Sequence, residues 1–316
     1  MTYPSTLAYL LIGKETTWGT AVTATKDAGL LITDTSPSID REVMESHTIS
    51  SIETQKVTSG IVDASFSVEG DYQHGRLFHF IIGPQTAVET TGDFKHTFTV
   101  ADAPDSMTAE KGNKSTASTD WTSAGLLCES AELSIALNEN LKLSSEWKGK
   151  TATAGTTGAT AVISTLPVFP HALCEVKINT TAASEVQSAS ISINKVVERS
   201  GGISSNLYQQ GHATELKFEF TAELGFTDDT YHELAFGGAS ILATGDPTGY
   251  EFEINADNGV ALGSGRREIK FVLENCITKS FSEATSVGGL TFITITGVGT
   301  FKELFTVDNI TGAAFI

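Results

Sequence analysis

Apolar and polar residues alternate along several stretches of the chain, which is the pattern of strands that bury one face. In residues 62–69 (VDASFSVE) every second position from Val62 is apolar, and the positions between are Asp, Ser, Ser and Glu. Residues 132–138 (ELSIALN) and 215–224 (ELKFEFTAEL) repeat the pattern. We therefore predict a mainly β fold of antiparallel strands, each with one core face and one solvated face.

Two of these strands correspond at a constant spacing along the chain. Phe66 and Phe220 are 154 positions apart, and the same spacing aligns residues 36–50 with residues 190–204. A third block, which aligns Cys128 with Cys276 and Gly149 with Gly297, needs a spacing of 148. We predict two duplicated β-sandwich units, residues 1–165 and 166–316. The alternative is chance similarity among strands rich in Ser, Thr and Ile.

Each unit is expected to carry one short flanking helix. Residues 73–82 follow a strand and end at Gly83-Pro84, and Asp228 or Asp229 can cap a second helix that ends at Gly237. The polar stretch at about 85–124 has no counterpart in the second half, so we predict an insertion or long loop there, with one strand around Phe94 and Phe98. Residues 46–59 and their counterpart 201–211 are predicted polar hairpins that reach a neighbouring subunit.

Composition narrows the functional classes. Asp and Glu (38) exceed Lys and Arg (20), and the net charge of −18 disfavours tight binding to nucleic acid phosphates. No stretch approaches the roughly 18 apolar residues of a membrane helix, and the N-terminus lacks the basic region of a signal peptide, so neither a membrane span nor export is expected. The three cysteines lack CxxC spacing, which predicts buried thiols in a reducing cytoplasm.

Catalytic motifs are missing from the sequence. It contains no P-loop, HExxH or GxSxG pattern, and its seven histidines are scattered. We therefore expect no metal, no cofactor and no enzymatic activity. The enzyme alternative is a β-sandwich carbohydrate hydrolase, which needs two carboxylates about 5 to 9 Å apart across a cleft. The three tryptophans lie far apart in sequence and indicate no aromatic-lined cleft.

The chain resembles a family of viral structural proteins. Residues 13–21 (GKETTWGTA) are similar to the opening motif of tail tube (major tail) proteins from viruses with long, non-contractile tails. Residues 36–39 (SPSI), 68–72 (VEGDY), 94–98 (FKHTF), 104–108 (PDSMT) and 186–194 (VQSASISIN) resemble later segments of that family. The resemblance covers most of the chain, and the opening motif is its most specific part.

The resemblance implies a structural virion protein without catalysis. Such a protein is a β-sandwich with a flanking helix, and its copies form rings whose inner strands join into one barrel. The rings stack into the tail tube that conducts DNA during ejection. Two units per chain imply that three copies make a pseudo-sixfold ring, although six copies stay open. The implied partners are the tape measure, terminator and distal tail proteins, with assembly in the host cytoplasm.

An acidic lumen suits a DNA conduit, because phosphates find no cation to pair with there. The candidate lumen-facing residues are the polar partners on the matched strands: Asp63, Glu69, Glu215, Glu219 and Glu223. The polar face need not be the inner one, since alternation alone does not say which face points inward. A different tail ring, such as a distal tail or adaptor protein, is the structural alternative.

Overall fold

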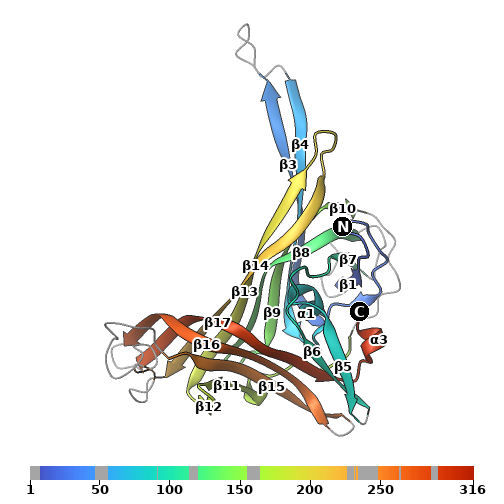
Figure 1. Cartoon of the computed structure of the whole chain (residues 1–316). Helices are drawn as coiled ribbons and strands as arrows, with labels where there is room; N and C mark the ends of the chain where they lie inside the picture. The colour runs from blue at the N-terminus through green and yellow to red at the C-terminus, as the bar shows by residue number, and fades with distance from the viewer. Residues whose placement is uncertain are drawn as a thin grey trace.

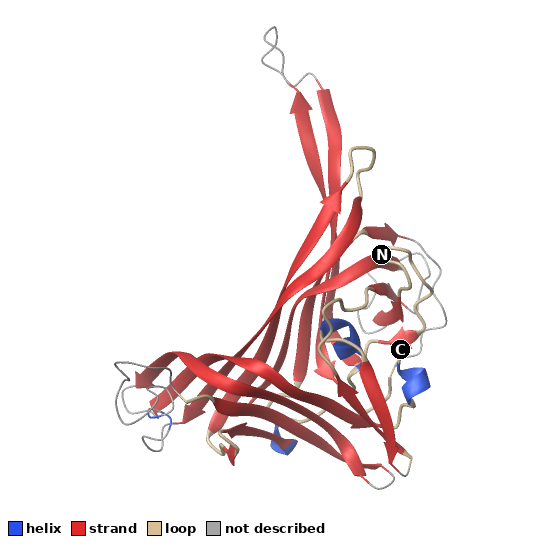
Figure 2. Cartoon of the chain, in the orientation of Figure 1, coloured by secondary structure: helices blue, strands red, loops and turns tan. Residues whose placement is uncertain are grey.

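Long antiparallel strands make up most of the computed structural model (Figure 2), which describes residues 8–46, 56–90, 92–113, 120–154, 164–225, 231, 233, 248–262, 265–285 and 291–316. The first half contains β1 (Ala8–Lys14), β2 (Lys26–Asp27), β3 (Leu30–Ser46), β4 (Lys56–Tyr72), α1 (Arg76–Ile81), β5 (Gln85–Thr90), β6 (Asp93–Phe98), β7 (Met107–Asn113), β8 (Trp121–Ala136), β9 (Lys142–Gly149) and β10 (Thr151–Ala154). The second half contains η3 (His171–Leu173), β11 (Cys174–Ile178), β12 (Thr181–Ala182), β13 (Val186–Gly201), β14 (Tyr208–Gly225), β15 (Tyr250–Leu262), β16 (Gly265–Thr285), β17 (Thr291–Asp308) and α3 (Gly312–Phe315).

Eight strands lie side by side in the order β3-β4-β9-β8-β13-β14-β17-β16, each antiparallel to its neighbours (Figure 1). We call this the main layer. It includes only the second part of β8, from Ser130 to Ala136, and the second part of β16, from Ser280 to Thr285. The first parts of both strands belong to other pairings. Within the described residues the main layer is open, with β3 at one edge and β16 at the other. A single chain therefore does not close into a barrel.

The long strands continue into a second set of pairings. The first part of β8 pairs with β7 and β10, and β7 pairs in turn with β1. The first part of β16 pairs with β15, and β15 pairs with β11. Register shifts interrupt β8 at Cys128–Ser130 and β16 between Val272 and Ser280. Such bulges bend a strand, which lets one strand serve two differently oriented parts of the sheet.

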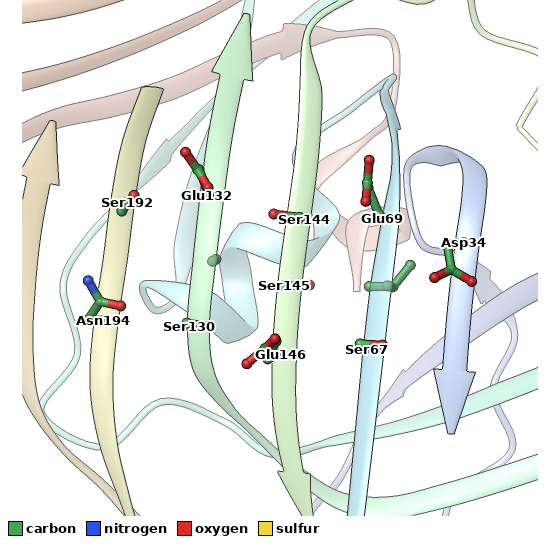
Figure 3. Close-up of a pocket in the computed structure, with 12 residues that line it drawn as sticks. Asp34, Ser67, Glu69, Ser130, Glu132, Ser144, Ser145, Glu146, Ser192 and Asn194 are labelled. Atoms are coloured by element: carbon green, nitrogen blue, oxygen red, sulfur yellow. The ribbon is translucent and has the colours of Figure 1, made fainter. Parts of the chain in front are cut away.

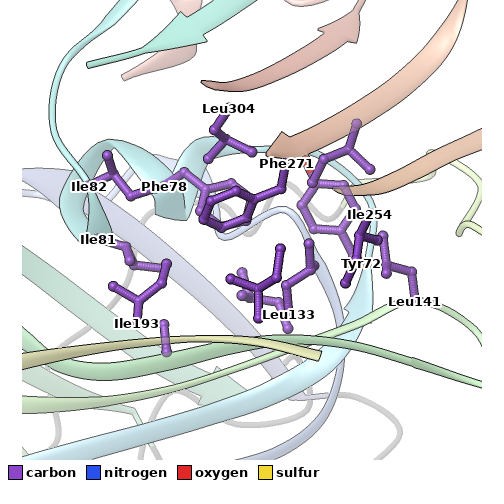
Figure 4. Close-up of a cluster of buried hydrophobic side chains, with 14 of the residues drawn as sticks. Tyr72, Phe78, Ile81, Ile82, Leu133, Leu141, Ile193, Ile254, Phe271 and Leu304 are labelled. Carbon is purple, nitrogen blue, oxygen red and sulfur yellow. The ribbon is translucent and has the colours of Figure 1, made fainter. Parts of the chain in front are cut away.

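The core lies on the apolar side of the main layer, where α1 is inserted (Figure 4). Every residue of α1 is buried. The ring of Phe78 packs edge-on against Phe98 and Phe271, with centroid distances of 5.9 and 6.4 Å. Leu133 of β8 and Ile193 of β13 approach the same cluster from the layer. The helix thus fills the space between the main layer and the strands formed by β15, the first part of β16 and the second part of β17.

Strand partners repeat along the chain. In the β3–β4 ladder Pro37 lies opposite Phe66, and in the β13–β14 ladder Ile191 lies opposite Phe220, so both members move by 154 positions. Phe66 also lies opposite Trp147 of β9, and Phe220 opposite Gly297 of β17. Trp147 and Gly297 are 150 positions apart. Their partners in the next ladder are Cys128 and Thr278, so strand pairing aligns Cys128 with Thr278, whereas the sequence alone aligns it with Cys276. The β4–β9 and β14–β17 ladders contain no register shift, so strand pairing replaces the sequence spacing of 148 with a spacing of 150.

Several sequence expectations can be compared with these elements. The helix expected at 73–82 is the shorter α1, and the second expected helix lies almost wholly outside the described residues, as does Gly237. The stretch 85–124 is more regular than a loop: β5 and β6 form a hairpin that pairs with β17, and β7 buries Met107 and Ala109. The polar composition of this stretch did not indicate strands, because β6 and β7 depend on pairing with β17 and β1, which are distant in sequence.

Candidate functional site

One face of the main layer is polar across many strands. Along β4 the even-numbered residues from Val62 to Val68 are buried, whereas Asp63, Ser65, Ser67 and Glu69 point away from the core. Because side chains alternate along a strand, the ladder partners of these residues share their face. That face carries Asp34, Ser36, Ser38 and Asp40 from β3, Ser144 and Glu146 from β9, Ser130 and Glu132 from β8, and Ser192 and Asn194 from β13.

The polar face is hollowed into a shallow depression of about 390 Å³ (Figure 3). Five strands line it, from β3 at one side to β13 at the other. Its charged side chains are all carboxylates, and its other polar side chains are serine hydroxyls and one amide. The lining residues are Asp34, Ser67, Val68, Glu69, Ser130, Ala131, Glu132, Ser144, Ser145, Glu146, Ser192 and Asn194.

The four carboxylates of the depression, Asp34, Glu69, Glu132 and Glu146, form no ion pair with any described residue. The nearest lysines of the same face are engaged elsewhere, since Lys142 pairs with Glu139 at 2.7 Å and Lys148 with Glu129 at 3.6 Å. Like charges on an open surface add to a negative potential that repels anions. This part of the face therefore disfavours phosphate groups.

Four of the five predicted lumen residues lie on this face, but they differ in their surroundings. Asp63 pairs with Arg199 at 2.8 Å, while Glu69 is exposed in the depression. Glu219 accepts a hydrogen bond from Lys217 (2.7 Å), which lowers the pKa of Glu219 below its usual value. Glu223 accepts a hydrogen bond from the Ser188 hydroxyl at 3.4 Å.

Glu215 does not belong to the regular part of this face. The β13–β14 register shifts there, because Lys195 lies opposite Leu216 and Val196 opposite Thr214, which leaves Glu215 unpaired in the ladder. Its φ of 50° is left-handed, as expected for a bulge residue. Simple period-two reading placed Glu215 in line with Glu219, and it failed because a bulge resets the alternation.

The sequence reasoning missed Asp34, Glu132 and Glu146 as members of the acidic face. Glu146 lies in residues 142–148 (KLSSEWK), where Leu143, Ser145 and Trp147 alternate inward. That alternation was a usable signal, although a serine at a core position weakened it. Asp34 gave no signal, because β3 contains Pro37 and most of its residues are exposed.

The opening motif has a structural role in this arrangement. The buried Glu15 carboxylate accepts hydrogen bonds from Gly19 N (2.8 Å), Gly125 N (2.7 Å), Ser106 Oγ (2.7 Å) and Thr108 Oγ1 (2.8 Å). These donors come from the motif loop, from β7 with its approach, and from β8. We call this set the Glu15 socket. It ties the N-terminal segment to the start of β8.

Trp18 extends this attachment to the second half of the chain. Its Nε1 donates to Gly125 O at 2.9 Å. A Cβ placed on Gly211 of β14 would lie 2.6 Å from the Trp18 ring, so only glycine leaves room for the indole. The motif therefore connects the first half to the β13–β14 hairpin.

The described residues carry neither a metal-binding cluster nor a membrane-spanning helix. They contain no group of three or more His, Cys, Asp or Glu side chains placed to hold a metal ion. In the same part of the chain, no helix is both long enough and apolar enough to cross a membrane.

Comparison with known proteins identifies a family. A family described as phage tail tube protein matches residues 5–296, nearly the whole chain. A search among curated proteins finds no match.

Proposed function

We propose a mode of assembly for this chain, which belongs to the phage tail tube protein family. It is accordingly a structural protein of the virion tail and not an enzyme. Membership implies that copies of the chain assemble with one another and with other tail proteins. We propose that the chain serves a long non-contractile tail that is assembled in the host cytoplasm.

The chain contains two tail tube units, residues 1–165 and 166–316, in this proposal. The support is the repeated pairing: β3, β4, β9 and β8 are neighbours in that order, and β13, β14, β17 and β16 follow in the same order. The outer pairings repeat as well, since β1 and β7 relate to β8 as β11 and β15 relate to β16. A strand order repeated with matching partners, at spacings of 154 and 150 positions, is hard to reach without duplication.

Three copies form the ring that we propose. Each chain supplies eight strands to the main layer, so three chains supply twenty-four. With neighbouring strands about 4.8 Å apart and tilted by about 40°, such a barrel has a backbone diameter of roughly 50 Å. Six chains would give roughly 100 Å by the same arithmetic. Three copies form the narrower channel, which confines a DNA duplex more closely.

The acidic face of the main layer lines the channel in this proposal. The observation that carries the assignment is the depression whose charged lining consists of four carboxylates, none of them in an ion pair with a described residue. The opposite face of the layer is apolar and is covered by α1, β15, the first part of β16 and the second part of β17, so it does not suit the wet surface of a channel. Stacked rings then form a conduit along which DNA slides without being held.

Negative-stain electron microscopy of the purified chain tests this function. Hollow tubes built of stacked rings are the expected result, with a channel set by a barrel of roughly 50 Å. Single rings that never stack would instead indicate a distal tail or adaptor ring. Monomers at all concentrations and salt conditions would contradict self-assembly.

A further inference from the structure

The main layer ends in two strand edges that face no other strand among the described residues. At one end β3 pairs only with β4. At the other end the second part of β16, from Ser280 to Thr285, pairs only with β17, because β15 pairs with β16 no further than Cys276. Such edges present backbone N–H and C=O groups to any strand that fits.

The chain contains its own example of how two such edges join. In the middle of the layer β8 meets β13 in a ladder that runs from Ser130 opposite Asn194 to Ala136 opposite Ser188. This pairing joins the two proposed units. We call it the internal junction.

The repeated ladders allow the register of a second junction, between two copies of the chain, to be predicted from the internal junction. Partners in β3–β4 and β13–β14 differ by 154 positions, so β13 corresponds to β3 at that spacing. Partners in β8–β9 and β16–β17 differ by 150 positions, so β8 corresponds to β16. We infer that β16 of one copy pairs antiparallel with β3 of the next, with Ser280 opposite Asp40, Phe281 opposite Ile39 and Ser282 opposite Ser38. The inference rests on the proposed ring and names its contact surface.

One exposed apolar residue supports this contact independently of the backbone. Ile39 on the β3 edge is 39% exposed, whereas Ile193, its counterpart at the internal junction, is 1% exposed. The position is covered where the edge is joined and uncovered where the edge is open. A neighbouring copy at the inferred register would place Ile39 against Phe281 and cover it as Ile193 is covered.

The β3 edge also carries features that limit indiscriminate pairing. Pro37 has no backbone N–H, and the ammonium group of Lys111 donates to Thr35 O. Proline and lysine are residues that protect edge strands from unintended partners. At the inferred register Thr35 and Pro37 take the places of Ala189 and Ile191, whose backbones bond to β8, so the β3–β16 ladder lacks the N–H donor of Pro37 and shares Thr35 O with Lys111. The pairing therefore depends on the remaining ladder bonds and on the contact of Ile39 with Phe281.

Cysteine cross-linking tests the register. At the internal junction Leu137 N donates to Gln187 O, so the odd-numbered residues of β13 form its ladder hydrogen bonds and the Ser192–Glu132 pair lies between them. The Ser38–Ser282 pair inherits this position, where Cβ atoms approach closely enough for a disulfide. The variant S38C/S282C, assembled and mildly oxidised, should give a covalent trimer on a non-reducing gel. The native cysteines serve as background in a wild-type lane.

The matched controls move one cysteine by two residues, in S38C/S280C and S38C/A284C. Diagonal neighbours are about 7 to 8 Å apart, so these variants should cross-link at least tenfold less. Tubes that form but cross-link best through a control, or through none, would overturn the register while leaving the tube function intact. Wild-type chain that forms no tube would instead overturn the function. If S38C/S282C does not assemble, a cryo-EM map of wild-type tubes tests the register instead. Phe281 is expected opposite Ile39 of the next copy, and any other neighbour would contradict the inference.

Discussion

At the scale of single residues, Glu15 is the side chain with the most demanding environment. Its carboxylate is buried and accepts four hydrogen bonds from three segments. A buried donor that loses its acceptor costs about 1 to 3 kcal/mol. The cluster of Glu, Thr, Trp and Gly at residues 13–20 is therefore explained by the attachment of the N-terminal segment.

Replacing Glu15 should destabilise the monomer strongly. Glu15→Ala leaves four donors without their acceptor, and we expect it to lower the free energy of unfolding by about 3 to 5 kcal/mol. Glu15→Gln keeps the shape and should cost less. Urea denaturation followed by circular dichroism measures both. The exposed Glu69→Gln is the control, expected within about 0.5 kcal/mol of wild type, and a Glu15→Ala variant equally close would contradict the socket.

The two aligned phenylalanines give a second prediction. Phe66 and Phe220 are both buried, and Phe220 stacks on Phe252 with a centroid distance of 4.6 Å. Phe66→Ala and Phe220→Ala should each lower the free energy of unfolding by about 3 to 5 kcal/mol, because each leaves a cavity. Ser65→Ala on the polar face should change it little. Chemical denaturation of the three variants provides the comparison, and a small loss for either phenylalanine would mean that its site collapses readily.

At the scale of elements, the β3–β4 hairpin extends furthest from the main layer (Figure 1). Its outer part, from Val43 to Ser46 and from Lys56 to Ser59, pairs only within the hairpin. Val43, Met44 and Val57 are exposed there. Apolar side chains on a projecting arm fit a contact with a neighbouring subunit or ring.

Changing this arm should impair assembly and spare the fold. The triple variant Val43→Thr, Met44→Thr and Val57→Thr keeps strand-forming or small side chains but removes apolar surface. We expect the free energy of unfolding to change by less than about 0.5 kcal/mol per site, and the yield of tubes in a sedimentation assay to fall at least tenfold. Val88→Thr, at an exposed site on β5, is the control. Normal tube yield from the triple variant, or from a deletion of residues 46–59, would exclude the arm from assembly.

The counterpart hairpin at residues 201–211 is a less clean test. Val62 N donates to Asn206 O at 2.8 Å, and Gly211 lies beneath Trp18. Removing this hairpin would uncouple β4 and the opening motif from the second half. We therefore expect its deletion to lower stability as well as assembly, unlike deletion of the first arm.

The sequence predicted elements best where one face is core and the other is solvent. β4, β14 and the second part of β8 follow strict alternation, and with them Asp63, Glu69, Glu219 and Glu223 were placed on one face. Alternation failed at bulges, as at Glu215, and in β7, which pairs with the remote β1 as well as with the adjacent β8. The polar β5–β6 hairpin read as a loop, because its strand character depends on pairing with β17.

At the scale of the whole molecule, the charge distribution is the property that matters for a conduit. The net charge of −18 includes the unneutralised carboxylates of the depression. In our proposal stacked rings multiply this field along the channel, and salt screens it over about 10 Å at 0.1 M ionic strength. DNA then moves through a channel that repels it evenly.

Reversing charge on the acidic face should convert the channel from non-binding to binding. Glu69→Lys with Glu132→Lys should leave tube formation intact, slow DNA ejection from reconstituted virions, and do so most at low salt, because the new lysines pair with phosphates. The control pair Glu89→Lys with Asp102→Lys makes the same charge change outside the main layer. Ejection rates equal to wild type at low salt would place the acidic face outside the channel.

The hairpin of β5 and β6 has a consequence for the history of the chain. It belongs to the first half, yet β6 pairs with β17, and His96 stacks on Phe315 at 4.1 Å beside Asp308. If the halves descend from one ancestral gene, this contact makes the fusion hard to reverse. If the gene were split, the first product would contain the β5–β6 hairpin without β17, its partner strand. The second product would contain β17 without β6 beside its C-terminal end. The two halves are then free to diverge as specialised neighbours, inherited as a pair.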